Sequence, residues 1–135
     1  MKIYFARSIR GERDSTEKFN IIMETLKRYG EVLTEHIDPK TIIKEERKHF
    51  TEEQIYTEDA DWIKESDIVV AEVSVPSLGV GYELAFAESL EKRVLCLYDS
   101  NSKWSLSAMV AGNKYFEIIK YSSVEELAKK LQELF

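Results

Sequence analysis

The chain has 135 residues, 44% of them hydrophobic and 33% charged, with a formal net charge of −6. This length is typical of one domain, so we expect a single domain over residues 1–135. The acidic balance argues against a duplex-binding surface, and no nucleic acid polymer is expected as a partner. No apolar run approaches the ~18 residues of a membrane span, and the first residues show no signal-peptide pattern. The sequence therefore predicts a cytoplasmic protein that engages no membrane.

Strand and helix patterns alternate along the chain. Apolar residues recur at helical spacing after Ser15 until Gly30, and a capping box at residues 51–54 begins a further helix. Strands are predicted at residues 2–6, 31–35, 67–73, 93–98 and 114–119, and helices at 15–29, 52–65, 84–92, around 106–110 and from 122 or 123 onward. Such alternation is typical of a parallel sheet with right-handed crossovers. The predicted fold class is α/β, a single doubly wound domain with a five-stranded parallel sheet, flavodoxin-like or Rossmann-like.

The stretch Pro-Ser-Leu-Gly-Val-Gly-Tyr-Glu, residues 76–83, joins the most apolar predicted strand to the helix after it. We expect a glycine-bearing turn, with Glu83 in or near the first turn of that helix. Gly79 and Gly81 would let the backbone approach a ligand closely or adopt a positive φ. The amides at a new helix start attract an anion such as a phosphate. From these residues alone, an ordinary turn with a helix-starting glutamate explains the stretch equally well.

Several polar residues follow predicted strands directly, at the edge of such sheets where ligands bind. The first loop, Arg7-Ser-Ile-Arg-Gly, is not a GxGxxG motif, and the glycine stretch lacks the Gly-Lys-Ser/Thr of a P-loop. Two histidines and no cluster of cysteines argue against a structural or catalytic zinc site. Cys96 lies in an apolar run and is predicted to be buried filler of a strand. The polar residues at this edge are Ser8, Arg10, His36, Ser77, Gly79 and Glu83.

Five stretches spread along the chain carry a resemblance to a known family. They are residues 4–11, 33–36, 58–59, 71–83 and 106–109. Together they resemble the 2′-deoxynucleoside 5′-phosphate N-hydrolases, which belong to the nucleoside 2-deoxyribosyltransferase superfamily. The resemblance implies a flavodoxin-like homodimer that cleaves the N-glycosidic bond of a nucleoside monophosphate without metal or cofactor. Arg7 departs from the best-known members, which have glycine there, and an extra cation could alter base or phosphate preference.

The resemblance also implies three catalytic residues. Glu83 would be the nucleophile, and Asp59 would orient it or handle a proton at the base. The hydroxyl of Tyr4 would touch the sugar or the catalytic carboxylate. Retaining sugar-transfer enzymes do use one carboxylate as nucleophile and a second group as acid. Without the resemblance, Asp59 is more simply a solvated helix charge, and Tyr4 a core residue.

Substrate-binding residues follow from the same resemblance. Two serines, an arginine and a glycine would hold the 5′-phosphate through hydroxyl, amide and charge-assisted bonds. His36 would stack on or bond to the base. Without the resemblance, an ordinary histidine of the loop explains this residue equally well. Ile9 or Tyr4 would lie near the 2′ carbon. The substrate-binding candidates are Ser8, Ile9, Arg10, His36, Ser77, Gly79, Ser107 and Met109.

Two of these candidates, Ser107 and Met109, match positions that the family supplies from the neighbouring subunit. A homodimer with composite active sites is therefore expected, and its interface would include Trp104, Leu106, Met109 and Val110 because these apolar groups need cover. For Met109, core filling is the alternative.

The expected function is hydrolysis of (deoxy)nucleoside 5′-monophosphates to free base and (deoxy)ribose 5-phosphate, through a glycosyl ester on a glutamate. Two alternatives remain open from the sequence. A deoxyribosyltransferase would move the sugar to another base instead of to water. A non-catalytic module of the same fold would bind a mononucleotide without cleaving it.

Overall fold

The computed structural model describes residues 1–8, 15–34 and 50–135. In these ranges five strands form one parallel sheet in the order β2-β1-β3-β4-β5. That order is the flavodoxin-like one, and the predicted fold class is confirmed. The strands are β1 (Lys2–Arg7), β2 (Glu31–Val32), β3 (Ile68–Glu72), β4 (Arg93–Asp99) and β5 (Glu117–Tyr121); the helices are α1 (Ser15–Lys27), α3 (Glu52–Glu65), α4 (Leu78–Ser89), α5 (Ala108–Ala111) and α6 (Val124–Leu134).

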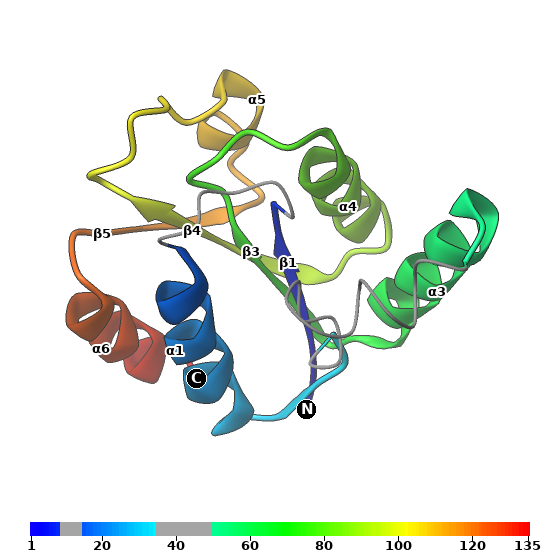
Figure 1. Cartoon of the computed structure of the whole chain (residues 1–135), viewed down its shortest axis with the longest axis horizontal. Coiled ribbons are helices and arrows are strands. Elements are labelled where there is room, and N and C mark those ends of the chain that lie inside the picture. Colours follow the sequence, from blue (N-terminus) through cyan, green and yellow to red (C-terminus); the bar gives the residue numbers. More distant parts are fainter. Residues whose placement is uncertain (9–14, 35–49) are drawn as a thin grey trace.

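The sheet lies between two layers of helices (Figure 1). Helices α1 and α6 cover one face through residues such as Ile22 and Leu131, and α3 and α4 cover the other through Ile63 and Leu84. Every residue of β3 is buried, as expected for a central parallel strand covered on both sides. None of the described helices is long and apolar enough to cross a membrane.

Strand β5 starts at Glu117, three residues later than the predicted start at residue 114. An asparagine turn accounts for the difference. The side chain of Asn113 accepts a hydrogen bond from the amide of Tyr115 at 2.9 Å, and its carbonyl accepts one from the amide of Phe116 at 3.2 Å. Asparagine side chains commonly hydrogen-bond to the backbone two residues later in the chain. Here the turn keeps the first apolar residues of the predicted strand out of β5.

Helix α4 starts at Leu78, so the predicted glycine turn is wrong. Ser77 is extended, with φ −149° and ψ 126°, and its hydroxyl oxygen accepts the amide of Val80 at 3.3 Å. Gly79 and Gly81 therefore lie inside the helix, and neither has a positive φ. Glu83 falls in the second turn. The serine N-cap offsets part of the helix penalty of the two glycines, and the burial of Val80, Leu84 and Ala87 against the sheet stabilises the helix further.

Candidate active site

Tyr4 and Glu83 are brought together from positions 79 residues apart. Tyr4 lies in the middle of β1 with its ring buried against the layer that holds α3 and α4. Its hydroxyl donates a hydrogen bond to Oε2 of Glu83, which is half-buried on α4. Tyr4 thus packs in the core, and its hydroxyl also reaches the carboxylate of Glu83. One oxygen of the Glu83 carboxylate is held at a defined place.

The other oxygen of Glu83 faces the surface of Gly79. A Cβ atom built on Gly79 would lie 3.9 Å from Oε1 of Glu83 and 3.9 Å from Oγ of Ser77. Residues four apart share a helix face, and long side chains lean toward the helix N-terminus, so Glu83 points back over Gly79. Because Gly79 has no side chain, it places no atom of its own between this carboxylate and the hydroxyl of Ser77.

The N-terminus of α4 borders this same space. The first amides of a helix have no partner within the helix and carry its positive dipole end. Ser77 takes the amide of Val80, and the amide of Gly81 bonds to the carbonyl of Ser77 at 3.1 Å. In the described part of the chain, no hydrogen bond uses the amides of Leu78 or Gly79. An anion placed here would meet two amides and lie near Glu83.

Asp59 lies half-buried on α3, the helix that packs against α4. One turn earlier on α3, the ring of Tyr56 meets the ring of Tyr82 at 6.2 Å between centroids. Tyr82 precedes Glu83 directly, so the turns that carry the two acids are neighbours. Tyr56 and Tyr82 are both more than half exposed, and the hydrogen bond with Tyr56 raises the pKa of Tyr82. This tyrosine pair was not predicted from the sequence, where its signal was an aromatic residue one helical turn before Asp59 and another directly before Glu83.

The first loop is described only at its start. Ser8 follows β1 directly and is buried, at the same sheet edge as the loop that ends β3. Ile9, Arg10 and His36 lie outside the described residues. Arg7 places its guanidinium 4.5 Å from the ring centroid of Phe19 on α1. Because side chains alternate along a strand, Arg7 points to the opposite face of the sheet from Tyr4.

Ser107 and Met109 lie on the far side of α4 from Glu83. Ser107 caps the short helix α5, and Met109 is 83% exposed. With Ser77 and Leu78 they line an apolar groove of about 630 Å³ between α4 and the 105–113 segment. Gly81 also lines this groove, and it lies roughly 200° around the helix from Glu83. Within one chain, therefore, the structure does not bring Ser107 and Met109 to the carboxylate.

Cys96, the single cysteine of the chain, lies in the core. Cys96 is fully buried in β4, and burial raises the pKa of its thiol to about 12. It is therefore a protonated packing residue, and the prediction of strand filler is confirmed. Across residues 1–8, 15–34 and 50–135, no group of three His, Cys, Asp or Glu side chains is arranged to hold a metal ion.

The strand order and the carboxylate of Glu83 define a flavodoxin-like domain with a candidate small-molecule site near the carboxyl ends of its strands. The family model for nucleoside 2-deoxyribosyltransferase matches residues 3–129. The chain belongs to this family.

Relatives and solved structures agree with the family. The chain is 41% identical to a 5-hydroxymethyl-dUMP N-hydrolase of Esox lucius, over 100% of this chain and 96% of the relative. It is 40% identical to a 5-hydroxymethyl-dUMP N-hydrolase of Mus musculus, over 98% of this chain and 79% of the relative. Among solved structures, a CMP N-glycosidase of Clostridium botulinum matches with a TM-score of 0.70 and 19% identity over 100% of both chains. This last likeness is one of fold.

Proposed function

We propose that this chain is a hydrolase that cleaves the N-glycosidic bond of 2′-deoxynucleoside 5′-monophosphates. Its products are the free base and deoxyribose 5-phosphate. The carrying observation is the Glu83 carboxylate, which Tyr4 holds by one oxygen while the other faces the space over Gly79 beside the start of α4. The names of relatives at about 40% identity, N-hydrolases of a deoxyuridine monophosphate, support the same reaction.

The reaction runs in two displacements at C1′ of the sugar. In the first, Oε1 of Glu83 bonds to C1′, the C1′–N bond breaks, and the base leaves with its electron pair and takes up a proton. In the second, water attacks C1′, the ester bond to Glu83 breaks, and the carboxylate is restored. Tyr4 donates to Oε2 and so orients the carboxylate, and Oε1, the oxygen nearer Gly79, is the attacking oxygen. Asp59 orients the nucleophile or handles the proton of the base.

The 5′-phosphate lies at the start of α4. There it meets the amides of Leu78 and Gly79 and the hydroxyl of Ser77, with Ser8 at the same sheet edge. Arg10 adds charge-assisted hydrogen bonds, and His36 and Ile9 contact the base and the 2′ side of the sugar. Each charge-assisted bond is worth about 1.5–3 kcal/mol, so losing two or three costs about a hundredfold or more.

The protein acts as a homodimer whose active sites are composite. Leu78 is 97% exposed and Met109 83% exposed, and both border the apolar groove along α4. A symmetric pair would cover these side chains, together with those of Trp104, Leu106 and Val110. It would also bring Ser107 and Met109 of each subunit to the site of the other, which one chain alone does not achieve.

A substrate panel tests the reaction. The purified protein is incubated with each deoxy- and ribonucleoside 5′-monophosphate and each free deoxynucleoside, and released base is separated by chromatography. We expect base release from deoxynucleoside monophosphates, with kcat/KM about a hundredfold above that of the free nucleosides. Equal kcat/KM for deoxyguanosine and its monophosphate contradicts the phosphate site. Tight binding of a nucleotide that stays intact for days identifies a binding module instead.

Adding free adenine to a reaction with a deoxycytidine nucleotide separates hydrolysis from transfer. Water and adenine compete for the same glycosyl ester. A hydrolase continues to give deoxyribose 5-phosphate, whereas a transferase gives the deoxyadenosine nucleotide.

Mixing two inactive variants tests the composite site. Glu83→Ala lacks the nucleophile, and Ser107→Glu repels the phosphate by like charge. In a mixed dimer one site receives both defects and the other receives neither. At a 1:1 ratio with free exchange, about half the dimers are mixed and about a quarter of the wild-type activity returns. No recovery despite proven exchange, or full activity in a monomeric sample, refutes the composite site.

A further inference from the structure

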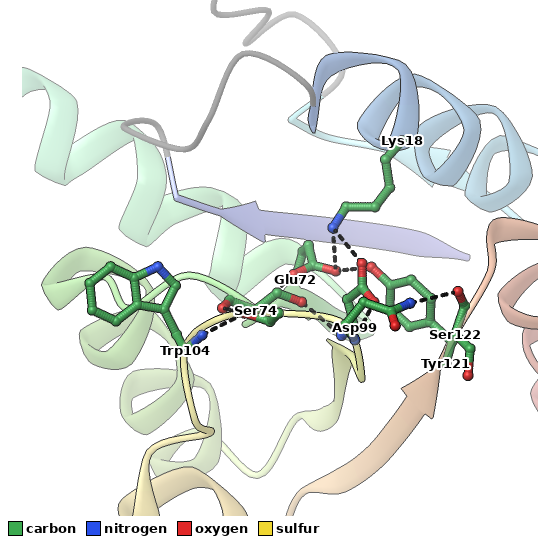
Figure 2. A network of polar contacts seen from close by, with 9 residues as sticks. Lys18, Glu72, Ser74, Asp99, Trp104, Tyr121 and Ser122 are labelled. Atoms are coloured by element: carbon green, nitrogen blue, oxygen red, sulfur yellow. Dashed lines mark hydrogen bonds and ion pairs between the residues drawn. The ribbon is translucent and has the colours of Figure 1, made fainter.

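A buried polar network joins the carboxyl ends of β3, β4 and β5 on the face covered by α1 and α6 (Figure 2). At its centre Glu72, the last residue of β3, accepts the hydroxyl of Tyr121 and, at 2.7 Å, the amide of Ser74. The ammonium of Lys18 lies 3.8 Å from Glu72 and 3.6 Å from Asp99, so two carboxylates share one cation. Burial first, and then the charge of Glu72, raise the pKa of Tyr121 well above its ordinary value, which keeps it a donor.

The amide, the hydroxyl and the carbonyl of Ser74 all form hydrogen bonds within the protein. Its amide donates to Glu72, and its hydroxyl oxygen accepts the amide of Asp99 at 2.8 Å. Its carbonyl accepts the hydroxyl of Ser102 at 2.6 Å, and Ser102 in turn accepts the amide of Trp104 at 3.1 Å. This chain of bonds fastens the loop after β3 to the loop after β4, as Figure 2 shows.

The fastened loop leads directly into the active site. Ser77, the N-cap of α4, comes three residues after Ser74, and the amides of Leu78 and Gly79 follow it. Ser74 is buried, whereas Ser77 and Gly79 are at or near the surface. Because the buried end of this short loop is pinned, the position of its exposed end is restricted.

We propose that Ser74 and Ser102, anchored by Glu72, are positioning residues for phosphate recognition. They hold the loop of residues 73–77 so that Ser77 and the first amides of α4 are already placed to receive the substrate's 5′-phosphate. The inference rests on the proposed function, in which the substrate is a nucleoside monophosphate. The unit acts through the backbone and does not touch the substrate.

The test compares Ser74→Ala and Ser102→Ala with Ser66→Ala. Ser66 is the matched control, since it is buried, donates its hydroxyl to the carbonyl of Ile63 at 2.8 Å, and precedes β3 at the opposite edge of the sheet. For each protein, kcat and KM are measured with a deoxynucleoside 5′-monophosphate. The matching deoxynucleoside is measured as substrate or, where turnover is too slow, as competitive inhibitor. Thermal midpoints are recorded alongside.

We expect KM for the monophosphate to rise about threefold to tenfold in Ser74→Ala and Ser102→Ala, because each removes one hydrogen bond that holds Ser74, with kcat within about twofold. The constants for the deoxynucleoside stay within about twofold, because it lacks the phosphate. Ser102→Thr, which keeps the hydroxyl on a half-buried residue, restores the KM. Ser66→Ala lowers the thermal midpoint without raising the KM.

Equal losses on the monophosphate and the deoxynucleoside, or the same KM change in Ser66→Ala, would show a structural role and overturn the inference. So would an unchanged KM in both loop variants. A wild-type protein that releases no base from any nucleotide overturns the proposed function itself. The two failures are therefore distinguished by the wild-type assay.

Discussion

Two tyrosine–glutamate pairs lie on opposite faces of the same sheet. Tyr4 donates to Glu83 on the side of α3 and α4, and Tyr121 donates to Glu72 on the side of α1 and α6. Both carboxylates come from the β3–α4 segment of the chain, and both are held by a phenol from another strand. Their second oxygens differ in what they face. Oε1 of Glu72 accepts the amide of Ser74, whereas Oε1 of Glu83 faces the space over Gly79.

Under the proposed function, this difference separates a reactive carboxylate from an anchoring one. A nucleophile needs an oxygen directed at a place where the substrate can lie. Glu72 is buried, and its oxygens serve a backbone amide, a phenol and a lysine. Glu83 is half-buried at the ligand-binding edge, beside the start of a helix. The four experiments below challenge this division of roles, beginning with the largest expected effect.

Glutamine in place of each glutamate is the most direct comparison. We expect Glu83→Gln to lose about 10³-fold or more in kcat because the nucleophile is gone, with its thermal midpoint almost unchanged. Glu72→Gln should keep more than about a tenth of kcat and lose stability by about 1–3 kcal/mol, since it weakens a buried network. Turnover and urea unfolding are measured on both. Wild-type-like turnover by a clean Glu83→Gln preparation would remove Glu83 as the nucleophile.

Gly79→Ala probes the space that Oε1 of Glu83 faces. The added methyl meets Glu83 and Ser77 at 3.9 Å, an ordinary contact, and alanine favours the helix, so stability should rise by roughly 0.5–1 kcal/mol. Activity should fall about 10- to 100-fold because the methyl takes room needed by the substrate.

Gly81→Ala makes the same change on the other side of α4, where the new methyl meets no atom of residues 1–8, 15–34 or 50–135 within 4 Å. At protein concentrations that keep the proposed dimer intact, it should lose clearly less activity than Gly79→Ala. If the two variants are equally active, the space over Gly79 does not hold substrate.

Removing one phenol hydroxyl at a time compares the two tyrosines. Tyr4→Phe should lower kcat about tenfold, since Oε2 of Glu83 loses the donor that orients it. Tyr121→Phe leaves Glu72 buried with one donor fewer and should lower the free energy of unfolding by about 1–3 kcal/mol, with kcat nearly unchanged. Steady-state kinetics and denaturant unfolding are measured for each. A loss of kcat in Tyr121→Phe together with a loss of stability in Tyr4→Phe would show that the two pairs have the opposite roles.

Thiol labelling of Cys96 also compares the two tyrosine–glutamate pairs, and it has the smallest expected effect. Burial raises the pKa of its thiol to about 12, so the native protein should resist a thiol reagent at pH 8 over hours. Labelling is followed by mass spectrometry with and without denaturant. Tyr121→Phe should label faster than Tyr4→Phe, because it weakens the network that joins the ends of β3, β4 and β5. Rapid labelling of the native wild type would contradict the burial.

Much of the fold was predictable because its signals are local. The alternation of apolar runs with helical spacing predicted the five-stranded parallel sheet, and Thr51 forms the capping box read from residues 51–54. The boundaries of α4 and β5 were wrong because a capping serine and an asparagine turn compete with propensity over a few residues. Ser8, Ser77 and Glu83 were placed at one sheet edge by topology alone.

The pairings between distant side chains lay beyond local pattern. The residues of the two tyrosine–glutamate pairs are 79 and 49 positions apart, and which carboxylate meets which phenol depends on strand order and on the face each side chain takes. Arg7 illustrates the same dependence, since the strand pleat turns it toward Phe19 and away from Tyr4. Glu72 stands in an otherwise apolar strand, where a charged side chain is normally paired, but the sequence does not identify its partners. Hydrophobic periodicity depends on residues that are close along the chain, whereas a functional site depends on residues that are close in the folded structure.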